Sequence, residues 1–137
     1  MAAAVNSGSI TSSADVEHVA LGPDGLIEGM APGSVLVDCS TIAPEAARHI
    51  AARLGEKGIA MLDAPVSGGA QGAIDATLAI MAGGEAEVLA RVRPLLECLG
   101  QRIVHIGPSG AGQVAKACNQ MIMVAAIQAA AEAMRLA

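Results

Sequence analysis

The chain has no Phe, Tyr or Trp among its 137 residues, although 53% of them are hydrophobic. Any core must therefore be built from Ala, Val, Leu, Ile and the seven Met residues. Without aromatic rings there is no platform on which nucleic-acid bases could stack. The hydrophobic fraction excludes a disordered chain, and the length suits a single domain with a substantial core.

Positive charge is also scarce. Eight Lys and Arg stand against thirteen Asp and Glu, which gives a formal net charge of −5. There is no basic cluster, so we expect no nucleic-acid partner. The three cysteines are far apart and form no C-x-x-C pair, which argues against a disulfide framework and a zinc site. We expect reduced, buried thiols at Cys39, Cys98 and Cys118 in a cytoplasmic protein.

Metal-binding patterns are missing as well. The three histidines lie apart and have no acidic or thiol neighbour at ligand spacing, so we expect surface or core roles and no metal site for His18, His49 and His105.

Targeting and membrane signals are weak. The N-terminal stretch MAAAVNSGSITSS has no basic region and no sustained apolar region, so we expect no secretory signal. The uncharged run between Lys116 and Glu132 is 15 residues long. As a helix it spans roughly 22 Å, against about 30 Å for the hydrocarbon core of a bilayer. A buried helix and no membrane partner are therefore expected.

Strand and helix patterns alternate along most of the chain. Short apolar runs predict strands at 34–39, 59–63, 77–82 and 102–106. Apolar residues at helical spacing predict helices at 44–57, at 85–99 and from 110 onward. This alternation is typical of an α/β fold with a mainly parallel sheet covered on both faces. Such sheets bind ligands beyond the carboxyl ends of their strands, here residues 38–41, 63–69 and 107–112.

The segment Asp38–Glu45 allows two interpretations. Ser40 or Thr41 could cap the following helix, with Pro44 in its first turn. The same hydroxyls and free N–H groups could instead lie beside a bound cofactor. Capping alone explains these residues equally well.

Two phosphate-binding motifs can be excluded for Gly107–Gly112. A P-loop needs Lys directly after its last glycine, but Gln113, Val114 and Ala115 come before Lys116. A dinucleotide fingerprint needs G-x-G-x-x-G, which occurs nowhere in the chain.

Lys116 is one of only two lysines and lies in an Ala-rich helical pattern. Asn119 and Gln120 follow at i+3 and i+4, on the same face. The simpler interpretation is a surface lysine with polar neighbours. However, most flanking residues are apolar, which predicts a mostly buried helix. A desolvated lysine has a lowered pKa and can act as a general acid or base.

Ser67-Gly68-Gly69 follows a predicted strand and also allows two interpretations. It could form a tight turn in which glycine adopts a positive φ. It could also form an anion cradle, where a hydroxyl and unobstructed backbone N–H groups receive a carboxylate.

Together these residues resemble the β-hydroxyacid dehydrogenases, the family of 3-hydroxyisobutyrate dehydrogenase and tartronate semialdehyde reductase (2-hydroxy-3-oxopropionate reductase). The similar stretches cover nearly everything after about Asp15. They are VALGPDGLIEGMAPGSVLVDCSTIAPEAAR, DAPVSGGAQGAIDATLAIMAGG and GAGQVAKACNQ.

The resemblance implies roles for individual residues. Lys116 would be the acid/base of an NAD- or NADP-dependent oxidoreductase that interconverts a small 3-hydroxy acid and its semialdehyde. Ser67, Gly68 and Gly69 would hold the substrate carboxylate. Asn119 would hydrogen-bond the substrate with Gln120 beside it, where many members have Asn at both positions. Thr41 matches a position that contacts the nicotinamide cofactor. A homo-oligomer is expected.

The chain also departs from the family. Members are about twice as long, open with a strand and G-x-G-x-x-G, and close with an all-helical domain. The resemblance makes residues 1–109 a partial Rossmann-type NAD(P)-binding domain and residues 110–137 the first part of the interdomain helix. Ser9-Ile10-Thr11 stands where members usually have an apolar-Leu-Pro segment against the cofactor.

We therefore expect little or no activity from this polypeptide alone, because hydride transfer needs a fixed cofactor. One alternative is a non-catalytic module that associates through an unpaired sheet edge and the last helix. Kinship with 6-phosphogluconate dehydrogenase would share the Ser-Gly-Gly and lysine pattern. That branch needs a basic phosphate site, which we do not find in the sequence.

Overall fold

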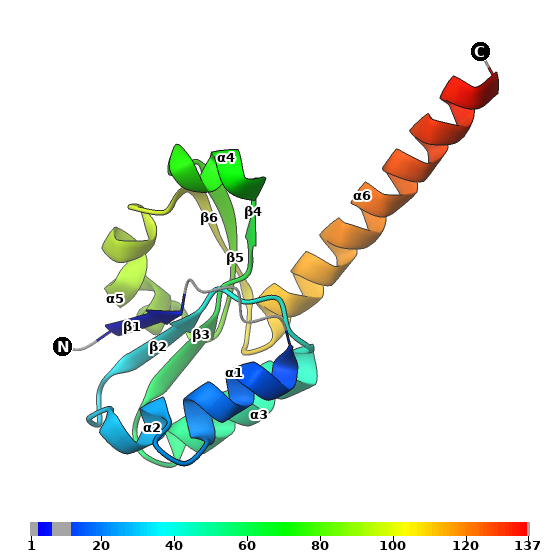
Figure 1. The fold of residues 1–137 in the computed structure, drawn as a ribbon. Helices are drawn as coiled ribbons and strands as arrows, with labels where there is room; N and C mark the ends of the chain where they lie inside the picture. Colours follow the sequence, from blue (N-terminus) through cyan, green and yellow to red (C-terminus); the bar gives the residue numbers. More distant parts are fainter. Residues whose placement is uncertain (1–2, 7–11, 137) are drawn as a thin grey trace.

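The computed structural model describes residues 3–6 and 12–136, and Figure 1 shows a sheet domain from which one long helix projects. The strands are β1 (Ala3–Asn6), β2 (Val35–Asp38), β3 (Ala60–Asp63), β4 (Val66–Ser67), β5 (Leu78–Gly83) and β6 (Gly100–Gly107). The helices are α1 (Ser13–Leu21), α2 (Leu26–Gly29), α3 (Pro44–Gly55), α4 (Gly69–Ile74), α5 (Ala86–Leu96) and α6 (Ala111–Leu136).

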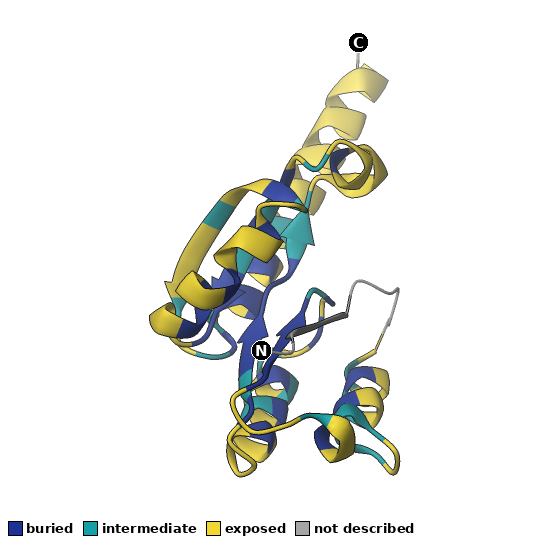
Figure 2. Cartoon of the chain, turned by 90° about the vertical axis from the view of Figure 1, so that its left-hand side faces the viewer, coloured by how far each residue is buried: buried dark blue, intermediate teal, exposed yellow. Residues whose placement is uncertain are grey.

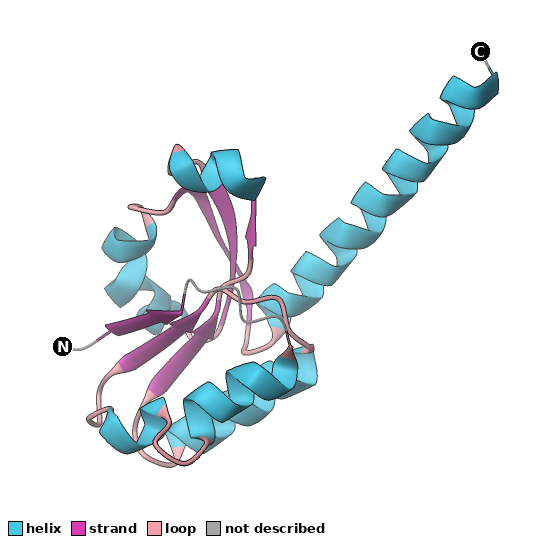
Figure 3. Cartoon of the chain, viewed as in Figure 1, coloured by secondary structure: helices cyan, strands magenta, loops and turns pink. Residues whose placement is uncertain are grey.

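The sheet has the order β1-β2-β3-β5-β4, and β6 pairs with β5 (Figure 3). The pairs β1–β2, β2–β3 and β5–β6 are parallel. Strand β5 runs antiparallel to β3 and β4, pairing with them through Asp63↔Gly83 and Ser67↔Ala79. The expected α/β fold with a mainly parallel sheet is therefore confirmed.

Two apolar clusters lie on opposite faces of the central strands β2 and β3. One joins residues of β2, β3 and β5 to α5, and the other joins the opposite side of β2 and β3 to α1, α2 and α3. The alternation along β2 shows this division, because Val35 and Val37 belong to the first cluster and Leu36 to the second. Figure 2 shows β2 and β3 buried in the interior, whereas β6 and the outer faces of the helices are largely exposed.

Every strand and helix predicted from the pattern is present, within a few residues of its expected ends. The elements that the pattern missed are β1, α1, α2, β4 and α4. They are short, and short elements carry little periodicity. A signal for α1 did exist, because Ser12 and Asp15 have the spacing of a helix cap and Ser12 Oγ accepts from Asp15 N at 3.2 Å.

The prediction that the last helix is mostly buried is wrong. Only Gly112, Gln113 and Lys116 of α6 are buried, and the helix is exposed from Met121 onward. Desolvation is confined to the end that touches the sheet. With 26 residues, α6 is also the one helix in the described part of the chain long and apolar enough to cross a membrane. Helices that pack inside soluble proteins share this property.

The start of α6 approaches the sheet so closely that it requires glycine. A Cβ at Gly112 would lie 2.7 Å from the carbonyl oxygen of Asp63 and even closer to that of Met81. We expect Gly112→Ala to lower the free energy of unfolding by about 3 kcal/mol, because backbone atoms cannot move aside. Gly55→Ala is the control, since a Cβ there would meet nothing within 4 Å. Urea unfolding of both variants gives the comparison, and equal stabilities would contradict the close approach.

Candidate active site

Asp63 joins the sheet to the long helix. It ends β3, is fully buried, and accepts hydrogen bonds from Gly110 N at 2.7 Å and from Gln113 N at 3.0 Å. The carboxylate therefore caps the N-terminus of α6, where the helix dipole favours negative charge. Burial raises the pKa of the Asp63 carboxyl, while the backbone hydrogen bonds act in the opposite direction.

Two glycines make room for this carboxylate. A Cβ at Gly83 would lie 2.6 Å from Asp63 Oδ1 and 2.7 Å from Gly112 N. Gly112 is similarly close to the strand end. Any side chain at these positions would separate β3, β5 and α6.

Gln113 ties the helix to a third segment. It is 1% exposed, its Nε2 donates to Ser40 O at 2.8 Å, and its Oε1 accepts from Ile42 N at 3.2 Å. One side chain thus bonds the backbone on both sides of Thr41. Sequence reasoning assigned no role to Asp63 or Gln113. The available signals were an Asp closing an apolar strand and a lone polar residue in the first turn of an apolar helix.

Thr41 lies at the carboxyl end of β2 and is exposed. The capping interpretation of Ser40 or Thr41 is wrong, because the N-cap of α3 is Ala43 and no side chain caps this helix. Pro44 does occupy the first turn, as expected. Because no side chain caps α3, its N-terminal N–H groups are available to an anionic ligand.

Lys116 lies one turn beyond Gly112, on the same helix face. That face touches β3 and β5, so Lys116 is 9% exposed although the residues around it are mostly more exposed. Burial lowers the pKa of the Lys116 ammonium. No described residue forms a hydrogen bond or ion pair with its Nζ, so this cation is desolvated without a charge partner.

Ser67, Gly68 and Gly69 follow Asp63 along nearly continuous extended chain. Ser67 is half-buried, and both glycines are exposed. Gly68 has φ +143° and Gly69 has φ +65°, values that L residues rarely adopt. This bears out the turn-forming role of the glycines, and the bare backbone remains compatible with an anion cradle. In Figure 1, β4 and α6 run in different directions.

Asn119 and Gln120 are half-buried on the second turn beyond Gln113. Asn119 Nδ2 donates to Gln120 Oε1 at 3.2 Å, so the two amides bond each other. This bond orients Asn119 and leaves its carbonyl oxygen available to a ligand.

The expectation of three buried thiols is wrong for two of them. Cys98 and Cys118 are exposed, and only Cys39 is partly buried. Burial, followed by the neighbouring Asp38 carboxylate, raises the pKa of the Cys39 thiol to about 11. Cys39 is therefore a thiol at neutral pH. In the part of the chain that the structure describes, no group of three His, Cys, Asp or Glu residues could hold a metal ion.

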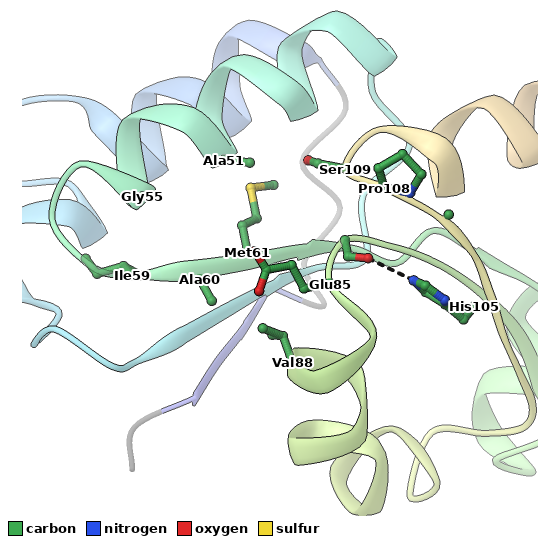
Figure 4. A pocket seen from close by; sticks show the side chains of 12 residues that line it. Ala51, Gly55, Ile59, Ala60, Met61, Glu85, Val88, His105, Pro108 and Ser109 are labelled. Atoms are coloured by element: carbon green, nitrogen blue, oxygen red, sulfur yellow. Dashed lines mark hydrogen bonds between the residues drawn. The ribbon is translucent and has the colours of Figure 1, made fainter.

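A separate cavity of about 580 Å³ lies where α3, β3, α5 and the segment after β6 face one another (Figure 4). It is mostly apolar, with Met61 and Val88 on its wall. His105 Nε2 is 2.8 Å from Gly84 O at its edge. None of the site residues predicted from the sequence lines it.

The three segments at the strand ends therefore meet, as predicted. Asp63 and Gln113 connect residues 38–42, 63–69 and 107–113 through hydrogen bonds. They do not form a single pocket, because Ser67 and Gly68 line one cavity while Gly107 and Ser109 line another. Ser9-Ile10-Thr11 lies outside the described residues.

Comparisons with known proteins define the class. The family model for the NAD binding domain of 6-phosphogluconate dehydrogenase matches residues 5–107. The chain is 51% identical over 127 residues to the NAD-dependent L-serine dehydrogenase of Pseudomonas aeruginosa. It is 51% identical over 121 residues to the 3-hydroxyisobutyrate dehydrogenase of the same organism. The matches cover 93% and 88% of this chain.

A solved structure agrees with these relatives. The 3-hydroxyisobutyrate dehydrogenase of Mycobacterium tuberculosis, solved with L-serine, matches with a TM-score of 0.86 and 41% identity over 92% of this chain. The family model and the fold thus place the chain in the class of the NAD binding domain of 6-phosphogluconate dehydrogenase. Within that class, the chain belongs to the β-hydroxyacid dehydrogenase family. It spans less than half the length of these relatives, between 41% and 43%.

Gln113 should hold the segment around Thr41 in place. We expect Gln113→Met to lower the free energy of unfolding by about 2 kcal/mol, because two buried backbone groups lose their partners. We also expect faster alkylation of Cys39, which lies next to Ser40, in a background where Cys98 and Cys118 are replaced by Ser. Exposed Gln101→Met is the control. An unchanged Cys39 alkylation rate in Gln113→Met would contradict this role.

Proposed function

We propose that this chain is part of an NAD- or NADP-dependent oxidoreductase that interconverts a small 3-hydroxy acid and its semialdehyde. Residues 1–109 would belong to the cofactor domain, and residues 110–137 to the helix that leads into a second domain. The names of the relatives, L-serine and 3-hydroxyisobutyrate dehydrogenases, support a substrate with a hydroxyl at C3 and a carboxylate. A cytoplasmic location and the absence of a membrane partner stay predictions.

The observation that carries this proposal is the position of Lys116. It is buried one turn beyond a helix start that Asp63 fixes to the carboxyl edge of the sheet, and none of the described residues pairs with its ammonium. A structural lysine would gain from reaching solvent or a carboxylate. Holding the amine desolvated is useful when it must gain and lose a proton near neutral pH.

In this mechanism Lys116 handles the proton. During reduction, its ammonium donates a proton to the carbonyl oxygen as that oxygen becomes a hydroxyl. During oxidation, the neutral amine takes the proton from the hydroxyl. The lowered pKa brings these two forms closer in free energy, so that both directions are accessible.

Ser67, Gly68 and Gly69 would bind the substrate carboxylate through the hydroxyl and the backbone. Asn119 would hydrogen-bond the substrate, with its orientation set by Gln120. A carboxylate held at one end and a proton donor at the other would align the carbon between them.

The residues present fit one end of a dinucleotide. Thr41 is exposed at the carboxyl end of β2, and the adjacent α3 N-terminus has no side-chain cap. Thr41 would contact the nicotinamide portion of NAD or NADP, and Gln113 keeps its backbone in place. The bound cofactor would supply or accept the hydride.

A titration of Lys116 tests this function. With the lysines reductively ¹³C-dimethylated, we expect the Lys116 amine to deprotonate at a lower pH than an ordinary lysine side chain, because burial lowers its pKa. Adding 3-hydroxyisobutyrate with NAD should shift the Lys116 signal and the amides of Ser67–Gly69, while the methyl ester should not. Binding is measured because it reports on the site whatever the turnover rate. An ordinary lysine pKa for Lys116, or no response to the hydroxy acid, would refute the proposal.

We also propose that the chain self-associates, in line with the expected homo-oligomer and with the alternative of a non-catalytic module. The exposed part of α6 carries large apolar side chains, among them Met121 at 73%, Ile122 at 72% and Val124 at 60% exposure. Covering them would remove apolar surface from water. Light scattering should therefore give a mass above 13.5 kDa, and Met121→Gln with Val124→Gln should shift it toward that monomer value. A monodisperse monomer for the unmodified chain would contradict association.

A further inference from the structure

A second cavity adjoins the Ser-Gly-Gly segment on the sheet. It has a volume of about 450 Å³ and is lined by Ser67, Gly68, Thr77, Ala79, Gln101 and Arg102. These residues supply two hydroxyls, one carboxamide and one guanidinium. The lining contains no carboxylate, so its polar groups suit an anionic ligand.

Strand pairing brings the key residues into one row. Ser67 pairs with Ala79 across β4 and β5, and Ala79 pairs with Arg102 across β5 and β6. Directly paired residues share a face, so Ser67 and Arg102 lie on the same side with only Ala79 between them. Their Cα atoms are two strand spacings apart, roughly 10 Å. A long arginine side chain spans much of that gap, and the small Ala79 leaves the space open.

This face is the one opposite α5. The neighbouring residues Val66, Ile80 and Ile103 belong to the apolar cluster that α5 covers. Figure 1 shows α5 and α6 on opposite sides of β5 and β6. The row Ser67–Ala79–Arg102 therefore faces the side from which α6 projects.

Arg102 is one of three basic side chains that form no hydrogen bond or ion pair with the described residues, the others being Lys116 and Arg135. The paired or bonded ones are Arg48, Arg53, Lys57 and Arg93, each with a glutamate, and Arg91, which donates to Gly33 O. Among the described residues, Arg102 forms no hydrogen bond or ion pair, and Arg135 near the end of α6 resembles it in this. Arg102 lines the cavity beside the Ser-Gly-Gly segment.

We propose that Arg102 is a substrate-binding residue, whose guanidinium acts with the Ser67 hydroxyl to hold the carboxylate of a small acid in this cavity. The proposal rests on the proposed function for the identity of that acid. Arginine suits the role because its planar fork matches both oxygens of a carboxylate. It also supplies positive charge that Ser67, Gly68 and Gly69 lack. The site would therefore select carboxylates over uncharged carbonyl compounds.

Binding of two acids tests the role of Arg102 separately from the proposed function. Isobutyrate carries the carboxylate without the hydroxyl, and 3-hydroxyisobutyrate carries both. Dissociation constants come from the amide shifts of Ser67, Gly68 and Ala79 in the ¹⁵N-labelled chain. We expect Arg102→Gln to weaken both acids roughly tenfold or more, because a charge-assisted hydrogen bond is lost. Arg102→Lys should fall between, and Arg135→Gln is the control for the same loss of charge at an exposed, unpaired arginine.

The outcomes distinguish the two ideas. If Arg102→Gln binds isobutyrate as tightly as the unmodified chain, or if the unmodified chain does not bind isobutyrate, the role of Arg102 is refuted. If binding of both acids depends on Arg102, the role of Arg102 is supported. If Lys116→Met then does not weaken binding of 3-hydroxyisobutyrate relative to isobutyrate, the role of Lys116 is refuted. Because Arg102 is exposed, its variants should remain folded, which urea unfolding verifies.

Discussion

The arrangement depends on one buried carboxylate. Asp63 ends a central strand and receives the first N–H groups of α6, which places the start of the long helix on the carboxyl edge of the sheet. A buried charge is costly unless hydrogen bonds and a favourable dipole compensate it, and the helix N-terminus provides both. The same contact requires bare backbone at Gly83 and Gly112. The carboxyl end of β3, the start of α6 and the two glycines are therefore joined by direct contacts into one unit.

This unit explains how residues far apart in the chain come to share one place. The backbone N–H of Gln113 donates to Asp63, and its side chain forms hydrogen bonds with the backbone on both sides of Thr41. Three residues later, Lys116 is pressed against the same strands and desolvated. The exposed threonine and the buried lysine, which we assign to cofactor and substrate, are therefore positioned by a single polar network. Their separation is set by hydrogen bonds from the buried side chains of Asp63 and Gln113 to the backbone.

Beyond this anchored start, α6 makes little contact with the rest of the structure. Its apolar residues after Met121 are exposed, which is unusual for so much apolar surface and supports association. The basic side chains also differ in whether they have a partner. In a chain of net charge −5, Arg48, Arg53, Lys57 and Arg93 each pair with a glutamate, whereas Lys116 and Arg102 have no hydrogen-bonding or ion-pair partner among the described residues. Unpaired cations at both places fit a substrate that brings its own negative charge.

The sequence by itself determined the alternation of strands and helices, the mainly parallel sheet and the family. Apolar periodicity and local motifs are visible in the sequence without knowledge of which residues are in contact. It also pointed to Lys116 and to Ser67-Gly68-Gly69 as candidates. Only the tertiary structure decided that Asp63 caps α6, that Gln113 binds the backbone around Thr41, and that Arg102 stands in one row with Ser67. Each of these relations joins residues from separate elements. The alignment of Ser67 with Arg102 also depends on the pairing register of β4, β5 and β6. The burial of α6 was misjudged for the same reason, since an apolar sequence shows what a helix could bury but the packing of its neighbours decides what it does bury.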